Sequence, residues 1–485
     1  MLTRLHALPF VLCCALTATA QVPALLRDIN PTSGSNVGGI TCVDGLVFFS
    51  ANDGTTGAET WVSDGTPSGT QLLKDINPGA AGSGPVSFLG WNDRVYFAAD
   101  NGVDGYQLWS TDGTTAGTQV ELTVDNVQDL ESASRFTVYG DIVIFRGETE
   151  ATGAELWRTD GTVEGTQLIL DINPGTFNSD PREFKVYDGR VYFSAYSPGI
   201  EQELWVTDGT AEGTQLVKDI DEEIGSSTPR DLTVVNDLLF FKASDGYAHD
   251  AELWATDGTS EGTYMVRDIV TGGNGSLPQN LVALGNAVWF SAYDGTRTKL
   301  WHSDGTAAGT LSLDTPVELF SEPDHLVAHG GYLYFSGYIN GSDQQLFRTD
   351  GTVEGTEHIV MPGSVVNGPL YPTNVITSCG DHLFFAANYD AAVGAEPYTL
   401  LSPVTVIEGQ ETERTRLYPV PTTDRLHLTN APANAVLRLY ATDGRSVFER
   451  PATDMDIREL PPGLYLARLT LPDGTTVLVQ QVVKE

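Results

Sequence analysis

The stretch "ELWRTDGTVEGTQLILDINPG", residues 155–175, decides the fold because the chain repeats it at a nearly constant spacing. Each copy joins an aromatic residue, an Asp-Gly-Thr turn, a second Gly-Thr and a short apolar segment. The aromatic residue recurs at Trp61, Trp109, Trp157, Trp205, Trp254, Trp301 and Phe347, and in a degenerate copy at Tyr398. The intervals between these positions run from 46 to 51 residues. Self-similarity at this period indicates a repeat architecture.

One period contains four expected strands and no helical pattern. In the second copy we expect them over "PVSFLGW" (85–91), "RVYFAAD" (94–100), "YQLWSTD" (106–112) and "TQVELTV" (118–124). The segments between them carry Asn, Asp and Gly, which tolerate left-handed backbone or hydrogen-bond to their own chain. Four antiparallel strands in each period are typical of a β-propeller blade.

The second strand of the period gives the number of blades. Its apolar triplet starts at Val47, Val95, Val143, Val191, Leu239, Val288, Leu333 and Leu383. The outer strand, "LLKDI" (72–76) in the first copy, is missing after Tyr398, whereas "LLRDINP" (25–31) precedes the first complete blade. An unpaired strand edge favours aggregation. We therefore predict an all-β, eight-bladed propeller over residues 21–401, in which the N-terminal strand completes the eighth blade.

The repeated residues have structural interpretations that compete with a functional one. The Trp is expected to fill the wedge between blades. The Asp-Gly-Thr is expected in the hairpin between the third and fourth strands, where Asp caps N–H groups and Gly takes positive φ. Hard oxygen ligands in such loops could instead hold calcium. The candidates are Asp64, Asp112, Asp160, Asp208, Asp257, Asp304 and Asp350. Each loop offers one dependable carboxylate without the spacing of a dedicated calcium loop, so we predict no cofactor and keep calcium as the alternative.

A glutamate precedes the aromatic residue by two positions in five copies. It is found at Glu59, Glu155, Glu203, Glu252 and Glu396. Gln107 and Lys299 stand at this position in two other copies. Because a cation or an amide can replace it, we expect a solvated or hydrogen-bonded strand position rather than a metal ligand.

The two ends of the chain have patterns of their own. Residues 1–20 join a basic start, an apolar core and a small-residue exit, which predicts a signal peptide cleaved between Ala20 and Gln21. No other apolar run approaches 18 residues, so no membrane span is expected. Residues 402–413 are expected to form a linker. Strands and turns alternate over 414–485, which predicts a small C-terminal β-sandwich domain.

These patterns resemble two known families. The "ELWxTDGTxxGT" phrase, over about residues 25–400, is similar to the ELWxxDGT repeat of secreted bacterial proteins, which implies extracellular display and offers no agreed catalytic residues. The C-terminal segment resembles the sorting domain of the Bacteroidetes type IX secretion system. The matching positions are Tyr418, Pro419, Pro421, Gly444, Arg445, Leu460, Gly463, Tyr465 and Lys484. This resemblance implies passage through the periplasm, recognition by the type IX machinery, and an extracellular or outer-surface location.

Charge excludes one class of partner. The chain has 26 Lys and Arg against 64 Asp and Glu, a formal net charge of −38. Such a surface repels phosphate backbones, so we expect no nucleic acid partner.

Two cysteines remain outside the expected signal peptide. Cys42 and Cys379 fall on the first strands of blades one and eight, which become neighbours only when the ring closes. We hypothesise a disulfide across this closure, which an exported protein can keep. In the repeat, Cys42 precedes Phe49 by seven residues and Cys379 precedes Phe385 by six. Because an odd offset turns side chains to different faces of a strand, the pairing stays open, and a Cα separation above about 7 Å would exclude it.

Two function classes stay open. We favour a secreted or cell-surface binding, adhesion or scaffold module for an extracellular glycan or protein, and the alternative is a glycan-active hydrolase or lyase on a propeller scaffold. No catalytic triad, nucleophile elbow, zinc ligand pair or phosphate loop is evident, so no catalytic residue is predicted. His325 and His329 are four residues apart but fall in an expected strand, about 13 Å apart. An enzyme should bring carboxylates with shifted pKa values together near the axis. Any specific site is expected where the repeat is irregular, at 120–140 or 311–331.

Overall fold

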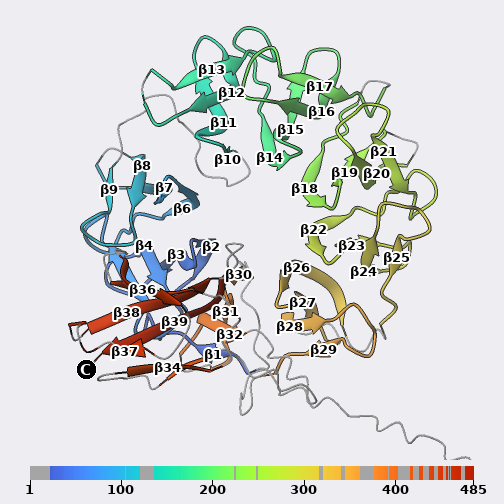
Figure 1. The fold of residues 1–485 in the computed structure, drawn as a ribbon. Helices are drawn as coiled ribbons and strands as arrows, with labels where there is room; N and C mark the ends of the chain where they lie inside the picture. The colour runs from blue at the N-terminus through green and yellow to red at the C-terminus, as the bar shows by residue number, and fades with distance from the viewer. Residues whose placement is uncertain are drawn as a thin grey trace, which may run out of the picture. The chain divides into compact units, whose positions relative to one another are not determined.

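The computed structural model is all-β within the residues that it describes. These are residues 22–401 apart from 104, 121–135, 163, 223–224, 247–248, 316–319, 340–343, 361–375 and 391–392, together with the strands and three adjoining positions between 416 and 484. The chain forms two compact units, and the first contains eight four-stranded antiparallel sheets arranged as a β-propeller (Figure 1). The predicted fold class is therefore confirmed.

In seven blades the strands form a meander that runs in chain order from the channel outward, and in the eighth blade β30, β31 and β32 are followed outward by β1 (Figure 1). The innermost strands are β2 (Gly38–Val43), β6 (Val86–Trp91), β10 (Phe136–Tyr139), β14 (Arg182–Tyr187), β18 (Arg230–Val235), β22 (Gln279–Leu284), β26 (Ser321–His329) and β30 (Thr377–Cys379). The second strands are β3 (Leu46–Asn52), β7 (Arg94–Asp100), β11 (Ile142–Thr149), β15 (Arg190–Ser197), β19 (Leu238–Ser244), β23 (Ala287–Tyr293), β27 (Tyr332–Tyr338) and β31 (His382–Ala387).

The third and fourth strands complete each sheet. The third strands are β4 (Ala58–Ser63), β8 (Tyr106–Thr111), β12 (Gly153–Thr159), β16 (Glu201–Thr207), β20 (Ala251–Thr256), β24 (Thr298–Ser303), β28 (Gln344–Thr349) and β32 (Glu396–Leu401). The outer strands are β5 (Gln71–Lys74), β9 (Gln119–Val120), β13 (Gln167–Leu170), β17 (Gln215–Lys218), β21 (Tyr264–Arg267), β25 (Leu311–Ser312), β29 (Glu357–His358) and β1 (Ala24–Leu25).

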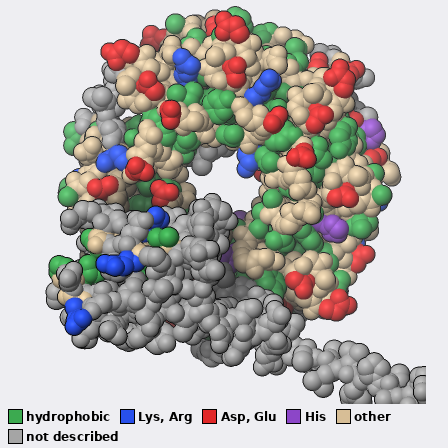
Figure 2. All heavy atoms as spheres, viewed as in Figure 1, with side chains coloured by type: hydrophobic (Ala, Val, Ile, Leu, Met, Phe, Trp, Pro, Cys, Tyr) green, Lys and Arg blue, Asp and Glu red, His purple; other side chains and the backbone are tan. Residues whose placement is uncertain are grey.

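This meander gives the ring two different faces. The Asp-Gly-Thr hairpins and the turns after the inner strands lie on one face, the hairpin face. The loops that cross from an outer strand to the next inner strand lie on the other, the crossover face. Carboxylates are spread over the side of the ring that is seen in Figure 2, and basic side chains are fewer.

The second strands form the core because neighbouring blades cover both of their faces. Phe48, Phe49, Phe97, Phe193 and Phe241 are among the largest fully buried side chains. The buried clusters join adjacent blades, as where Tyr192 of β15 packs with Phe241 of β19. Unalternated apolar triplets are expected for strands with two covered faces.

The N-terminal strand completes the eighth blade as predicted. β1 pairs antiparallel with β32, with Ala24 opposite Thr399 and Leu25 opposite Tyr398. Beyond this ladder the N–H of Ile29 donates to the buried carboxylate of Glu396 at 3.0 Å. The last third strand therefore has no free edge at the point where the ring closes.

A disulfide joins Cys42 of β2 to Cys379 of β30, with the two Cα atoms 5.4 Å apart. The one-residue offset that argued against this pairing is what the geometry requires. Equivalent positions on neighbouring inner strands point the same way around the ring, so two side chains face each other only when they are an odd number of positions apart. The preceding junction repeats the arrangement, because His329 and Ser378 have the same offset and their Nδ1 and Oγ atoms lie 2.8 Å apart.

The second unit contains two antiparallel sheets. One has the order β33 (Arg416–Tyr418), β34 (Arg425–Thr429) and β37 (Met455–Asp456). The other has the order β36 (Ser446–Pro451), β35 (Val436–Ala441), β38 (Gly463–Thr470) and β39 (Thr476–Lys484). Leu437 and Leu439 of β35 are fully buried.

Replacing both Cys42 and Cys379 by Ser should lower the free energy of unfolding of the propeller by about 2–4 kcal/mol. The reason is that the bond constrains a loop of 337 residues in the unfolded chain. Urea unfolding followed by tryptophan fluorescence measures the difference. Reductant should lower the midpoint of the wild type and leave that of the double variant unchanged, and equal wild-type midpoints with and without reductant would contradict the role of the disulfide.

Candidate functional site

The Asp-Gly-Thr hairpin is closed by its own side chains, as predicted. In blade four, Oδ1 of Asp208 accepts the N–H and the hydroxyl of Thr210 at 2.9 and 2.7 Å, and the Thr210 hydroxyl accepts the N–H of Gly213. The same bonds recur at Asp64, Asp112, Asp160, Asp257, Asp304 and Asp350. The hydrogen bonds from Thr210 lower the pKa of Asp208. A Cβ on Gly213 would lie 2.0 Å from Oδ1 of Asp208, which explains the second glycine of the phrase.

The first glycine of the phrase forms the contact with the preceding blade. In the seven hairpins it has φ between +86° and +96°, a backbone conformation that glycine adopts without strain. A Cβ on Gly258 of blade five would lie 2.3 Å from the hydroxyl oxygen of Tyr192 in blade four. Gly65 of blade one faces His382 of blade eight in the same way, at 2.9 Å. The hairpins therefore pack the ring together along the hairpin face.

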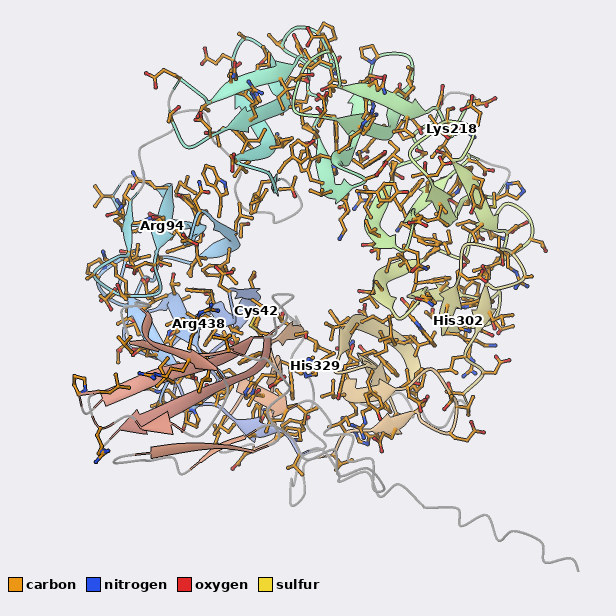
Figure 3. The ribbon with its side chains drawn as sticks, in the orientation of Figure 1. Cys42, Arg94, Lys218, His302, His329 and Arg438 are labelled. Atoms are coloured by element: carbon orange, nitrogen blue, oxygen red, sulfur yellow. A yellow bond between two sulfur atoms is a disulfide. The ribbon has the colours of Figure 1, made fainter. Side chains whose placement is uncertain are left out.

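A cation of the outer strand bridges to the next hairpin. Nζ of Lys74 donates to the carbonyl of Thr118 at 2.6 Å and lies 5.5 Å from the ring centroid of Trp109. Lys218 and Arg267 make the same bond to the next blade, and Lys218 lies on the outer side of the ring in Figure 3. Arg27, beside β1, donates to the carbonyl of Thr70 at 2.8 Å and lies over Trp61. The Trp therefore packs in the wedge between blades, as predicted.

The repeated glutamate is buried, so the expectation of a solvated position was wrong and that of a hydrogen-bonded one is confirmed. Glu203 is fully buried, and its carboxylate accepts the N–H groups of Ile220 and Ser227 at 3.0 and 2.9 Å and the Ser227 hydroxyl. Both partners belong to the loop that crosses to blade five, which the carboxylate holds in place. Burial raises the pKa of Glu203 to about 7, against these hydrogen bonds. Burial likewise raises the pKa of Glu155 and that of Glu396 to about 7.

Blade six reverses the charges of this arrangement. Lys299 takes the place of the glutamate, and its Nζ lies 2.8 Å from Asp294 and 2.9 Å from Asp314. Asp314 in turn stands where the outer strand of blade one has Lys74. Blade six thus has ion pairs where blade one has a glutamate bonded to loop N–H groups and a lysine bonded to a carbonyl of the next blade.

The channel wall carries polar residues on strand bulges. Glu183, Asp231 and Asn280 have left-handed backbone, with φ of 61°, 59° and 56°, at the same bulge of β14, β18 and β22. The N–H of Asp231 donates to Oε2 of Glu183 at 3.1 Å, and the amide of Asn280 donates to Asp324 at 2.6 Å. Burial raises the pKa of both Glu183 and Asp231. These residues could not be predicted from the repeat, because only the register at the bulges places them side by side.

The histidines are placed separately. The Nδ1 of His325 lies 3.1 Å from the hydroxyl of Ser336, while His329 bonds to Ser378 across the blade junction. His329 lies on the channel side of the ring in Figure 3. The predicted separation of the pair is consistent with these different partners. Within the described residues, no three His, Cys, Asp or Glu side chains gather as a metal site.

Other predicted site residues lie outside the described part of the chain or are described by backbone alone. Ala20, Gln21, Pro419, Pro421, Gly444 and Arg445 are outside it. Tyr418 ends β33, Gly463 begins β38, Tyr465 lies on β38 and Lys484 ends β39. The irregular stretch 120–140 is described only at Val120 and 136–140.

The amino-acid sequence of the second unit matches a known family of export domains. Residues 416–485 match the secretion system C-terminal sorting domain. The chain therefore carries a type IX sorting domain, which directs it to secretion at the outer surface or beyond. No helix in the described part of the chain is long and apolar enough to span a membrane.

Solved structures resemble the chain at low identity. A puromycin hydrolase mutant matches at 12% identity over 81% of this chain and 57% of its own, with a TM-score of 0.41. A structure from a study of two prolyl endopeptidases matches at 9% over 92% and 56%, with a TM-score of 0.47. PorZ, a surface component of the type IX secretion system of Porphyromonas gingivalis, matches at 11% over 93% and 82%, with a TM-score of 0.29. The chain thus spans less than three fifths of the first two proteins, and these likenesses assign no activity to it. No curated protein matches the chain.

The raised pKa of the buried glutamates predicts a pH dependence of stability. Between about pH 4.3, where glutamate ionises in unfolded chains, and about 7, the folded protein holds more protons than the unfolded one, so these groups make stability fall as the pH rises. Glu203→Gln removes one such group, and its melting temperature should fall less steeply between pH 5 and 8 than that of the wild type. The exposed Glu212→Gln in the same blade should keep the wild-type slope. Parallel curves for wild type and Glu203→Gln, measured by scanning calorimetry, would contradict the assignment.

Calcium at the hairpins can be tested directly. Because Oδ1 of each hairpin aspartate already accepts two hydrogen bonds, we expect the melting temperature to be the same in 1 mM calcium and in chelator. A rise with calcium that Asp208→Asn diminishes would favour the calcium alternative, since Asn keeps the Oδ1 acceptor and loses the charge.

Proposed function

We propose that this chain is an extracellular binding module, in which a type IX-exported propeller presents a rigid ring to a glycan or to another surface protein. The carrying observation is that the repeated Asp, Glu, Trp and Lys side chains are engaged within and between the blades. Recognition then falls to residues that differ between blades, on the channel wall and the crossover loops. The sorting domain supports an outside location for this activity.

Export completes the proposal. A leader over residues 1–20, cleaved between Ala20 and Gln21, would bring the chain to the periplasm, where the disulfide between Cys42 and Cys379 can form. The type IX machinery would then recognise residues 416–485.

One observation favours the alternative, a glycan-active hydrolase or lyase. Glu183 and Asp231 are carboxylic acids on neighbouring inner strands, and burial raises the pKa of both. Paired carboxyl groups of this kind serve as acid and base in glycoside cleavage.

A glycan array probed with the purified propeller, with and without chelator, should give reproducible binding of a limited set of glycans. An array without binders would overturn glycan recognition. Incubation of the bound glycans with the protein, followed by product analysis, separates the two classes. If the wild type cleaves a bound glycan and Glu183→Gln binds it without cleaving it, the protein is a glycan-active enzyme and the proposal of a binding module is wrong.

A further inference from the structure

Equivalent positions of the blades show where a charge lacks its partner. In blade three, Nε of Arg146 on β11 lies 2.7 Å from Oδ1 of Asp180, and the side chain is nearly buried. Arg182 on β14 of blade four binds the other oxygen of the same carboxylate. Asp180 precedes β14, so one aspartate of the crossover loop neutralises a cation on each of the blades that it joins.

Blade five carries cations at both of these positions. Lys242 on β19 is opposite Leu253 of the third strand, as Arg146 is opposite Leu156. Arg230 begins β18 as Arg182 begins β14.

The aspartate has no counterpart there. The residue at its place is Thr228 on entry to blade five and Leu277 on exit. Asp180, Thr228 and Leu277 all have left-handed backbone, with φ of 47°, 45° and 52°. The N–H of each donates to a carbonyl of a third strand. The backbone of the crossover loop is thus kept while its carboxylate is absent.

Arg230 and Lys242 are directly opposite each other on the two strands. Like charges in this arrangement repel. Within the described part of the chain, neither side chain has a hydrogen bond or an ion pair. Two acids lie beside them: Asp231, whose carboxylate accepts the N–H of Asn280, and Glu183, whose carboxylate accepts the N–H of Asp231. Each of these carboxylates bonds to a backbone N–H of the neighbouring inner strand, and within the described residues neither forms an ion pair with Arg230 or Lys242, so both cations keep donors for an oxyanion.

The surroundings of this pair are apolar and open. Leu277 is 49% exposed and Tyr293 is 38% exposed. The two are adjacent, because the N–H of Tyr293 donates to the carbonyl of Ser276 at 2.8 Å. Arg230 is exposed at the crossover-face end of the channel wall. An exposed apolar surface beside unpaired cations is unusual on a protein of net charge −38.

We propose that Arg230 and Lys242 bind a carboxylate or sulfate group of an acidic sugar, whose ring lies against Leu277 and Tyr293. A planar guanidinium recognises an oxyanion through two parallel N–H donors, and the ammonium adds a second positive charge. The ligand carries its acidic groups sparsely, because the strongly acidic protein repels a dense polyanion at long range. This inference rests on the proposed binding of glycans and adds the charge of the sugar and the place where it binds.

The test measures glucuronate, glucose, glucose 6-sulfate and N-acetylaspartate binding to the disulfide-bonded propeller by ligand-observed saturation-transfer NMR at matched ionic strength. We expect the two acidic sugars to bind and glucose to bind at least tenfold more weakly. Lys242→Ser and Arg230→Gln, which copy Ser194 of blade four and Gln279 of blade six, should each weaken acidic-sugar binding about tenfold, the effect of losing roughly 1.4 kcal/mol.

Two further variants keep both cations but give each an aspartate as an intramolecular partner, so that the cation no longer binds the ligand. Leu277→Asp and Thr228→Asp install the aspartate of blade four beside Lys242 and Arg230, and each should weaken binding by a similar factor. Arg190→Gln, which removes an exposed cation from the hairpin face, should leave binding unchanged.

The outcomes separate this site from the proposed function. Acidic sugars that bind the wild type and Leu277→Asp equally would overturn the site, while glycan binding itself would stand. If N-acetylaspartate binds as tightly as glucuronate and the glycan array shows no binders, the ligand is not a sugar, and an acidic peptide is indicated instead. Array binding together with glucuronate binding that is weakened in all four variants supports the inference.

Discussion

The contact between a hairpin glycine and the preceding blade is the constraint on which the ring depends. At Gly258 the left-handed backbone brings the hairpin so close to Tyr192 that a methyl group would overlap the phenol oxygen. The aspartate and threonine that follow satisfy the polar groups of the turn, so the turn can pack against a neighbour without unpaired donors. Lysine or arginine of the preceding outer strand then bonds to the same hairpin, as Lys218 does to Thr263. A short phrase thus specifies the blade and its junction together.

The junction that closes the ring, between blades eight and one, must also hold two neighbouring blades together. The junction between blades eight and one uses the ordinary contacts, with Gly65 against His382 and Arg27 against Trp61. It adds the disulfide at a position where the preceding junction has the His329 and Ser378 pair. A covalent bond is useful here because the eighth blade takes strands from both ends of the unit, and pairing of such distant segments costs more chain entropy than a local hairpin.

The fold could be predicted from the sequence because every blade repeats the same evidence. Eight apolar triplets fixed the number of blades, and the missing outer strand fixed the role of β1. The glutamates were harder, since charged residues are seldom buried without a partner. The partners of Glu203 are N–H groups of a loop and the hydroxyl of Ser227. A serine also follows Glu59, Glu155 and Glu252 by 24 residues and donates to each, and this spacing is the signal in the sequence that could have shown the buried position. Site residues were harder still, because the bulge at Asp231 shifts the register between β18 and β19 and hides which side chains lie opposite each other.

Some residues that depart from the repeat bring a partner of opposite charge with them, and others do not. We attribute the first kind to the stability of the fold and the second kind to ligand recognition. Blade six replaces Glu by Lys299 and places Asp314 beside it, so the charge exchange ends in an ion pair. Blade five places Lys242 opposite Arg230, and within the described residues neither of these two side chains has an ion pair. Repulsion of this kind is unfavourable for folding alone. An uncompensated departure in an otherwise regular ring therefore indicates a group supplied from outside, and it lies in a blade whose sequence is regular rather than in the irregular stretches where a site was expected.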